Sequence, residues 1–281
     1  SAQILRAKQF FYHARDTRLA PDAYMSCASC HNDGGDDGRT WDLTGMGEGL
    51  GNTVNLPGRS GAQGFLHWSA NFDEVHDFEG QIRALAGGTG LMSDADFNAG
   101  TRSQPLGLPK AGLSADLDAP AAYVGSLDAF AASPHRNNDG TLTTAAVAGR
   151  ELFQSANCAQ CHGGSSFTRS AGANLQNIGT LKPHSGQRLG SPLAGIGVPT
   201  LRDAWATAPY LHDGSAATLS AAISAHSGIS FGAADLANLV AYVEQIGAQE
   251  PSAPAPNSAP TLTSPGNQSG YTGVARRLHL R

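Results

Sequence analysis

The sequence predicts a mainly α-helical protein made of two similar helical units in tandem, with long glycine-rich loops and a short extended or β-stranded tail. Three observations support this fold class. A Cys-x-x-Cys-His pattern occurs twice, apolar residues at helical spacing precede each copy, and glycine is abundant, with 35 in the chain. The chain has 281 residues, the length of about two domains.

The two pentapeptides are Cys27–His31 and Cys158–His162. In such a run the two thiols can form thioethers with the vinyl groups of a haem, and the imidazole can bind its iron. The sequence therefore predicts two covalent haem c cofactors. The predicted attachment residues are Cys27, Cys30, Cys158 and Cys161, and the predicted proximal iron ligands are His31 and His162.

Other uses of these cysteines fit poorly. A structural zinc site has its two Cys-x-x-Cys pairs about 15 to 20 residues apart, whereas these pairs begin 131 residues apart. A thioredoxin-like redox pair lies within a βαβ pattern, and no strand-like runs flank either pair. Four cysteines in 281 residues are also too sparse for a disulfide framework.

The repeat extends beyond the pentapeptides. Residues 4–11 and 147–153 have helical spacing ahead of the two motifs. An Ala-Asp-Leu run, four further residues and an Ala-Tyr-Val run occur at 115–124 and again at 234–243. Each half thus has a helix, a haem motif, a glycine-rich loop and a closing helix, an arrangement typical of cytochrome c. Pro120 removes one backbone donor and should kink the first closing helix.

These patterns divide the chain into three parts. We expect a first cytochrome c-like domain over 1–135 and a second over 136–248, because turn formers are concentrated around 133–140. Residues 249–281 form the third part. It begins as a Pro-rich extended linker and continues with the alternation typical of β structure, like the first strands of a truncated immunoglobulin-like module. We expect this tail to dock on its own body or on a neighbouring subunit.

Composition limits the partners and the location. The formal net charge is −5, which argues against nucleic acid as a partner. No apolar run approaches the roughly 18 residues of a membrane span. The chain begins at Ser1 without a signal-peptide pattern, so we expect any export signal to have been removed. Covalent haem attachment normally follows export, and the expected location is therefore the periplasm or the cell exterior.

The second half resembles a known family. Residues 198–202 (Val-Pro-Thr-Leu-Arg), 207–215 (Thr-Ala-Pro-Tyr-Leu-His-Asp-Gly-Ser) and 218–219 (Thr-Leu) are similar to the C-terminal half of bacterial di-haem cytochrome c peroxidases and MauG-like proteins. In the peroxidases, the residue about eleven positions beyond the His-Asp-Gly-Ser run is a Met ligand of the electron-transfer haem. In this chain the resemblance places His226 there.

Methionine is absent after Met92, so the second haem has no Met ligand in its own half. His184, His212 and His226 are the strong-field candidates. Together with the resemblance, this predicts His226 as the distal ligand of the second haem. A Tyr serves that haem in MauG-like proteins, and no Tyr lies near position 226. Histidine in place of methionine should lower the potential of the haem.

The first half resembles the same family more loosely. Residues 10–12 and 26–31 match its opening, and the resemblance places Trp68 between the haems as a candidate electron bridge. Residues 77–81 resemble the Leu-Glu-x-Gln stretch that follows. Ten residues later the peroxidases have a Glu that moves a proton during O–O cleavage, and this chain has Leu91. Acid–base catalysis needs a positioned proton carrier; Glu48, Asp73, Glu74 and Glu79 are candidates among which the sequence does not select.

The distal ligand of the first haem also stays open. We favour His67, which adjoins Trp68, and His76 is second, with Met46 and Met25 as further candidates. The resemblance further implies a calcium ion between the domains. The matching residues are Asn52, Thr207 and Pro209, which offer the oxygen ligands that Ca²⁺ prefers.

Three functions follow from these patterns. The favoured one is an exported di-haem cytochrome that passes electrons to a redox partner protein or a neighbouring cytochrome. Whether the protein is an enzyme is left open: the alternative is a peroxidase or MauG-like oxidant whose first haem is open. A third possibility is a homo-oligomeric, surface-displayed electron-conducting assembly joined through residues 250–281. Leu91 and His226 favour the electron carrier.

Overall fold

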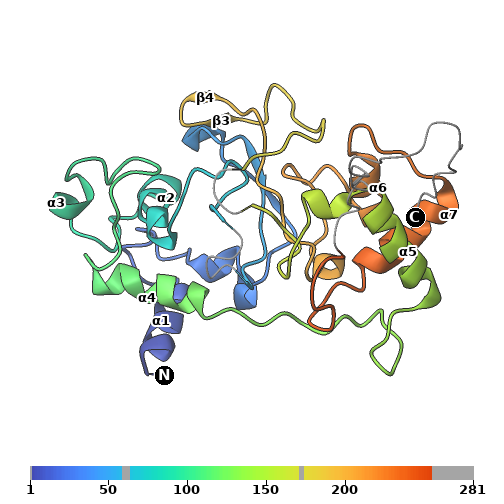
Figure 1. The fold of residues 1–281 in the computed structure, drawn as a ribbon. Coiled ribbons are helices and arrows are strands. Elements are labelled where there is room, and N and C mark those ends of the chain that lie inside the picture. Colours follow the sequence, from blue (N-terminus) through green and yellow to red (C-terminus); the bar gives the residue numbers. More distant parts are fainter. Residues whose placement is uncertain (1, 59–63, 171–173, 255–281) are drawn as a thin grey trace, which may run out of the picture.

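The computed structural model describes residues 2–58, 64–170 and 174–254 of the chain. Helices α1 to α4 gather at one end of the molecule and α5 to α7 at the other (Figure 1). The two groups repeat one packing scheme, so the mainly α-helical fold expected from the sequence is confirmed. The β strands expected in the tail lie outside the described residues.

Two helices far apart in the sequence form the core of the first half. Helix α1 (Ala2–Tyr12) packs against α4 (Ala115–Gly125), and the ring centroids of Phe11 and Tyr123 lie 4.8 Å apart. The Ser114 side chain caps α4 by accepting the backbone N–H of Leu117, which satisfies one donor that the helix leaves free. Pro120 lies inside α4, as predicted, and the helix continues past it. Two shorter helices complete this end of the molecule, α2 (Phe78–Leu85) and α3 (Asp94–Phe97).

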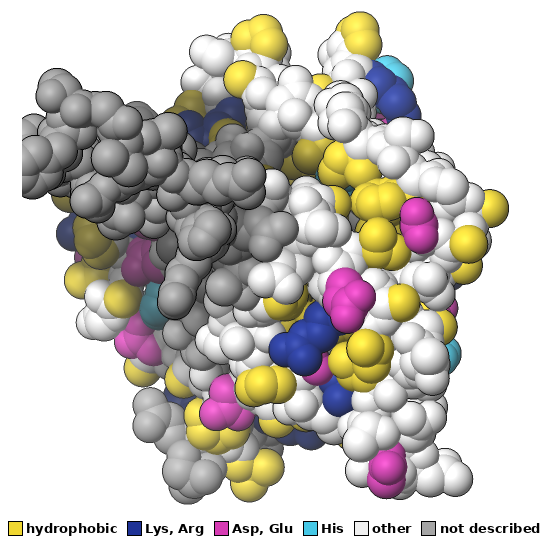
Figure 2. Space-filling view, turned by 45° about the vertical axis from the view of Figure 1, so that its right-hand side comes forward, with side chains coloured by type: hydrophobic (Ala, Val, Ile, Leu, Met, Phe, Trp, Pro, Cys, Tyr) yellow, Lys and Arg dark blue, Asp and Glu magenta, His cyan; other side chains and the backbone are white. Residues whose placement is uncertain are grey.

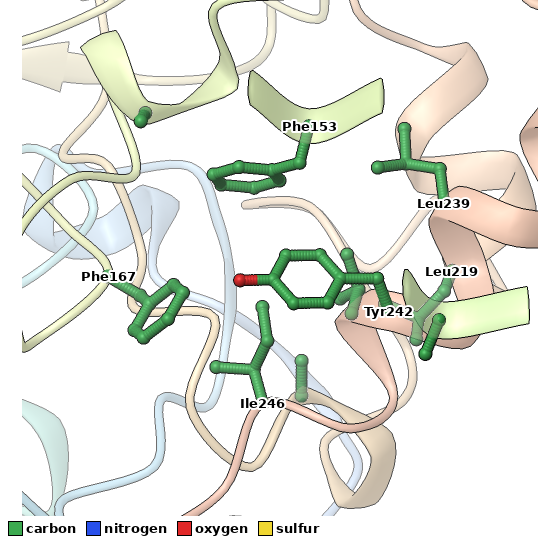
Figure 3. Packing of buried hydrophobic residues seen from close by; sticks show 10 residues of the cluster. Phe153, Phe167, Leu219, Leu239, Tyr242 and Ile246 are labelled. Carbon is green, nitrogen blue, oxygen red and sulfur yellow. The ribbon is translucent and has the colours of Figure 1, made fainter. Parts of the chain in front are cut away.

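The second half repeats this arrangement. Helix α5 (Thr144–Ser155) packs against α7 (Ala233–Val243), while α6 (Leu219–Ser224) adds a third side. Tyr242 lies between Phe153 and Ile246 in this core (Figure 3), and its ring centroid is 5.4 Å from that of Phe153. The aromatic pair of the first half therefore has a counterpart in the second.

Short elements connect these helices. Six 3-10 turns occur among the described residues: η1 (Cys27–Ser29), η2 (Asn32–Gly34), η3 (Thr44–Met46), η4 (Val75–Asp77), η5 (Cys158–Gln160) and η6 (Ala204–Ala206). Strand β1 (Thr40–Asp42) pairs antiparallel with β2 (Leu50–Asn52), and β3 (Gln187–Arg188) pairs with β4 (Ser191–Pro192). These ladders are small, so the loops depend on packing and side-chain hydrogen bonds for their shape.

An extended segment, residues 126–143, runs beneath the molecule from α4 to α5 (Figure 1). Its middle already packs on the second half, because Ser133 Oγ donates to the carbonyl of Glu244 at 2.7 Å and the Ala131 N–H donates to Asp203 Oδ2 at 3.1 Å. The domain boundary at 135 stays a prediction, and contacts with the second half begin a few residues before it.

Loops from the two halves also meet directly. The Asn52 N–H donates to the carbonyl of His212 at 2.7 Å, and Arg188 Nε donates to the carbonyl of Ser69 at 2.9 Å. Such contacts fix the loop that carries β2 and the loop around Ser69 against residues 186–212. This junction separates the two cavities described below.

On the face drawn in Figure 2, hydrophobic, acidic and basic side chains of the described residues are interspersed, and neither sign of charge dominates. Within the described ranges, every helix is too short or too polar to cross a membrane.

Candidate haem sites

The two Cys-x-x-Cys-His motifs adopt the same backbone shape. In the first, the His31 N–H donates to the carbonyl of Cys27 at 3.0 Å; in the second, the His162 N–H donates to the carbonyl of Cys158 at 2.9 Å. Each motif is therefore a single helical turn that begins at the first cysteine, at η1 and η5. Such a turn gathers two thiols and one imidazole at one wall of a cavity, which is the geometry that haem attachment requires.

Three of the four cysteines are neutral thiols. Burial raises the pKa values of Cys27, Cys30 and Cys158 to about 11. This buried environment suits residues that react once with a vinyl group and then lie beside a porphyrin.

A cavity of about 410 Å³ lies beside the second motif, and its wall includes Cys158, Cys161, His162 and His226. The imidazole centroids of His162 and His226 are 6.5 Å apart. Two metal–imidazole bonds of about 2 Å, with about 1 Å more from each nitrogen to its ring centre, span about 6 Å. The two rings therefore have the separation that one iron between them requires.

The chain around His226 fixes the orientation of its ring. His226 follows α6, and its Nδ1 donates to the carbonyl of Ala222 at 3.0 Å. A proton on Nδ1 leaves the lone pair of Nε2 for a metal, and such a backbone carbonyl is a common partner of a metal-binding histidine. On the other side, burial and the nearby His226 lower the pKa of His162 to about 4, while the backbone at Phe167 and Pro199 opposes this shift. His162 is therefore neutral, the form that binds a metal.

The other two candidate ligands of the second haem lie elsewhere. Neither His184 nor His212 belongs to the wall of the second cavity. His212 instead lines the first cavity, where it is 1 % exposed and its Nε2 lies 2.9 Å from Ser185 Oγ. Its Nδ1 is buried with no hydrogen-bond partner in the described part of the chain. Sequence reasoning missed this position, because the residue comes from the other half of the molecule.

The first cavity has a volume of about 230 Å³ and lies beside the first motif. Cys27, Cys30 and His31 form part of its wall, and His31 Nδ1 lies 3.2 Å from the carbonyl oxygen of Gly35. As for His226, donation from Nδ1 to a carbonyl leaves Nε2 available to a metal. Both motifs therefore fit a haem, because each presents a pair of thiols and an imidazole to a largely apolar cavity. A backbone carbonyl orients His31 at the first cavity and His226 at the second, whereas His162 Nδ1 has no hydrogen-bond partner among the described residues.

His67 also lines the first cavity, and hydrogen-bond partners surround both of its ring nitrogens. Its Nδ1 is 2.6 Å from Glu48 Oε1 and 2.8 Å from Asn71 Oδ1, and its Nε2 is 3.0 Å from Gln81 Oε1. Its role as an iron ligand stays a prediction. The other candidates are Met25, which lines this cavity, and Met46 and His76, which do not.

The structure distinguishes among the four acidic residues that the sequence offers as proton carriers, which are Glu48, Asp73, Glu74 and Glu79. Glu48 alone among them lines the first cavity. Burial by itself would raise the pKa of Glu48, but the hydrogen bonds from His67, Asn71 and Ser69 outweigh burial and lower it. Glu79 is fully buried and accepts the backbone N–H groups of Leu91 and Met92, which is a structural role.

Trp68 lies at the junction of the two cavities and contributes to the wall of both. Its indole Nε1 donates to the carbonyl of Asn52 at 2.8 Å, which holds the ring in place. This position is compatible with the predicted role of Trp68 as an electron bridge, and that role stays a prediction.

The three residues matched to a calcium site, Asn52, Thr207 and Pro209, all line the second cavity. Asn52 Nδ2 donates directly to the Pro209 carbonyl at 2.5 Å. Among the described residues, no group of three or more His, Cys, Asp or Glu side chains could hold a metal ion. The calcium site stays a prediction. The hydrogen bond from Asn52 to Pro209 joins the two halves at this point.

Comparison with known proteins agrees with this geometry. The cytochrome c family model matches residues 146–247. The hydrazine synthase subunit gamma of Kuenenia stuttgartiensis is 27 % identical over 257 residues, which cover 78 % of this chain and 68 % of that protein. The cytochrome c peroxidase Ccp of Escherichia coli is 27 % identical over 248 residues, 75 % of this chain and 50 % of that one. The chain is thus similar over about three quarters of its length to a hydrazine synthase subunit and to a cytochrome c peroxidase, and its second half matches the cytochrome c family model. This similarity confirms the resemblance to di-haem cytochrome c peroxidases and MauG-like proteins seen in the sequence.

A solved structure extends the likeness to the fold. A MauG-like protein associated with microbial copper homeostasis superposes with a TM-score of 0.61 over 88 % of both chains, at 20 % identity. At this identity the likeness concerns the fold alone. The chain spans about two thirds of the hydrazine synthase subunit and half of the peroxidase. The match to the cytochrome c family model and the similarity to cytochrome c peroxidases support haem c as the cofactor.

Proposed function

We propose that this protein is an exported electron-transfer protein with two haem c groups, one attached at each Cys-x-x-Cys-His turn. One observation carries the proposal: His162 and His226 both line the second cavity, and their ring centroids lie 6.5 Å apart. An iron bound by both imidazoles has no free position for a substrate. Such a haem gains and loses electrons without binding a small molecule, so the second haem serves electron transfer.

Trp68 supports transfer between the two haems. The indole ring belongs to both cavity walls and is held by Asn52, a residue that also lines both cavities. Electrons that enter at one haem therefore have a path to the other through a side chain that lines both cavities. The chain residues that hold the cofactors are Cys27, Cys30 and His31 at the first site and Cys158, Cys161, His162 and His226 at the second.

A second candidate function has its own supporting observation. The first cavity has a polar side built from Glu48, His67 and Gln81, whereas a haem that only carries electrons needs no such group. This arrangement favours an oxidant or peroxidase in which the first haem binds a small molecule and the second supplies electrons.

Mass spectrometry and low-temperature EPR test the proposal. The intact protein should carry the mass of two haems, and the oxidised protein should show one low-spin signal that becomes high-spin in His226→Ala. His184→Ala is the matched control, because His184 lies outside the second cavity, and it should keep the wild-type spectrum. A chain with fewer than two haems, or an unchanged spectrum in His226→Ala, would contradict the proposal.

We further propose that the protein acts outside the cytoplasm, since covalent haem attachment accompanies export, and that it works in a multi-subunit assembly. One relative is by name a subunit of hydrazine synthase. The tail beyond residue 254 is the segment that we propose for self-association. Glu250 is buried, so a truncation must begin after Pro254 to leave the body intact. Loss of residues 255–281 should lower the mass in light scattering, and an unchanged mass would contradict a role of the tail in assembly.

A further inference from the structure

A buried carboxylate and an imidazole face each other at the first cavity. Glu48 and His67 both line it, with side chains that are 8 % and 11 % exposed, and Glu48 Oε1 lies 2.6 Å from His67 Nδ1. The pair comes from two separate loops, one before β2 and one before η4. His31, the predicted proximal ligand, lines the same cavity.

The surroundings of Glu48 fix this carboxylate in place. Ser69 Oγ donates to its Oε2 at 3.0 Å and Asn71 Nδ2 donates to its Oε1 at 2.9 Å, so both oxygens have partners before His67 is counted. A buried carboxylate with several donors stays ionised. It therefore binds the proton of Nδ1 and orients the ring, as the carboxylate does in a Ser-His-Asp triad.

The backbone and the aromatic neighbours hold the ring as well. His67 has a φ of 63°, in the left-handed region that non-glycine residues rarely adopt. Its ring lies against Phe72 and Phe78, with centroid distances of 4.3 and 5.0 Å. The second nitrogen, Nε2, points to Gln81, which also lines the cavity. A ring held on all sides by hydrogen bonds and packing suits proton transfer to a bound molecule.

We propose that His67, positioned by Glu48, is the proton-transfer group of the first haem pocket and that the pocket takes hydrogen peroxide. The pair supplies from another part of the chain the function that Leu91 cannot perform. This inference deepens the second candidate function and rests on a haem at His31. It replaces the iron-ligand role expected for His67 from the sequence.

The chemistry balances as a two-electron reduction. A haem held by Cys27, Cys30 and His31 would supply the position that binds peroxide and would accept two oxidising equivalents. His67 accepts the proton of the nearer peroxide oxygen and returns it to the farther oxygen, which leaves as water when the O–O bond breaks. The remaining oxygen becomes a second water with two protons from solvent and two electrons from an external one-electron donor protein. The sum is one hydrogen peroxide, two protons and two electrons to two waters.

Two variants and two controls test the pair. His67→Phe removes both nitrogens yet fits the site between Phe72 and Phe78, and Glu48→Gln removes the charge that orients the ring. Glu48→Asp keeps the charge and should retain part of the fluoride affinity and of the rate with peroxide that Glu48→Gln loses. His76→Gln is the matched control, because His76 pairs with Asp118 and lies outside the first cavity.

The main readout does not require turnover. Fluoride on a ferric haem accepts a hydrogen bond from a neighbouring donor, and loss of one hydrogen bond should weaken fluoride binding about tenfold in His67→Phe. Glu48→Gln should also weaken it, and His76→Gln should not. The second-order rate with peroxide should fall by a factor of about 10² to 10⁴ in His67→Phe, the usual contribution of general acid–base catalysis.

EPR of the wild-type protein tests the proposal even if a variant does not fold. The proposal expects a high-spin signal from the first haem of the oxidised or half-reduced protein, in addition to the low-spin signal of the second. A first haem that is low-spin in both states, or an unchanged fluoride affinity in His67→Phe, overturns it. Neither result affects the proposed electron-transfer function, which fails only if two haems or the His226-dependent signal are missing.

Discussion

Tyr242 packs nearly edge-on against Phe153, with an interplanar angle of 70° and ring centroids 5.4 Å apart. This contact joins α7 to α5 and repeats the contact of Tyr123 with Phe11 between α4 and α1. Aromatic pairs in this geometry stabilise a core by about 0.5–1.5 kcal/mol beyond the area that they bury. In each half, this aromatic pair packs the helix before the haem motif against the closing helix after it.

The close approach of α5 and α7 leads to a first prediction. A methyl group on Gly149 would lie 1.9 Å from the carbonyl oxygen of Asn238, and that backbone atom cannot move aside cheaply. Gly149→Ala should therefore lower the free energy of unfolding by about 1–3 kcal/mol, the usual cost of overpacking a core. Urea unfolding followed by circular dichroism measures the change.

Gly125→Ala is the matched control. Gly125 ends α4, and a methyl group there would meet nothing within 4 Å. Alanine is the better helix former by about 1 kcal/mol, so this variant should be as stable as the wild type or slightly more stable. Equal stability of both variants would show that the contact of Gly149 with Asn238 is not tight.

The sequence predicted those parts of the fold whose signals are local. The Cys-x-x-Cys-His turns depend on a few consecutive residues, and the helices at 115 and 233 carry the repeated Ala-Asp-Leu and Ala-Tyr-Val runs, so both were foreseen. The Glu48–His67 contact was not, because it joins two loops that have no periodic pattern. Likewise, no local signal could place His212 in the cavity of the other half. His226 was selected only through family resemblance, since a histidine in an Ala/Ser-rich helix looks like a surface residue.

The proposed ligand His226 gives a prediction for the redox potential. Methionine in place of histidine raises the potential of a haem, and axial ligands together span about 0.8 V. His226→Met should therefore raise the potential of the second haem by something on the order of 0.1 V, while the first haem keeps its potential. A potentiometric titration followed by absorbance measures both. A change confined to the first haem would mean that the ligand assignment is reversed.

A buried ion pair ties the end of the described chain to the second half. Arg136 Nη2 and Glu250 Oε2 lie 2.6 Å apart, with side chains that are 6 % and 4 % exposed. Glu250→Ala would leave the guanidinium buried without its partner, which typically costs about 3–5 kcal/mol. Asp94→Ala is the control: Asp94 is 83 % exposed in its pair with Arg83, and such surface pairs contribute about 0–1 kcal/mol. Similar losses in the two variants would refute a special role of Glu250.

The acid dependence of stability should depend on Asp213. Burial alone would raise the pKa of Asp213, but the Lys182 ammonium, 2.7 Å away, and the Ser215 hydroxyl and N–H lower it to about 2, from an ordinary value of 3.8. A carboxyl whose folded-state pKa is lowered stabilises the fold above its unfolded-state pKa, and this contribution disappears as the pH falls through the folded-state value. The relevant window is therefore about pH 4 to 2.

Lys182→Met tests this dependence. The Lys182 side chain is 44 % exposed, so solvent screening limits its contribution to about 1 kcal/mol. At pH 6 the variant should be less stable than the wild type by about that amount, and the difference should shrink toward zero as the pH falls to 2 and below, because Asp213 then becomes protonated in both. Urea titrations at several pH values measure the difference. A difference that stays constant from pH 6 to pH 2 would mean that Lys182 stabilises the fold through packing of its aliphatic stem and not through the charge of Asp213.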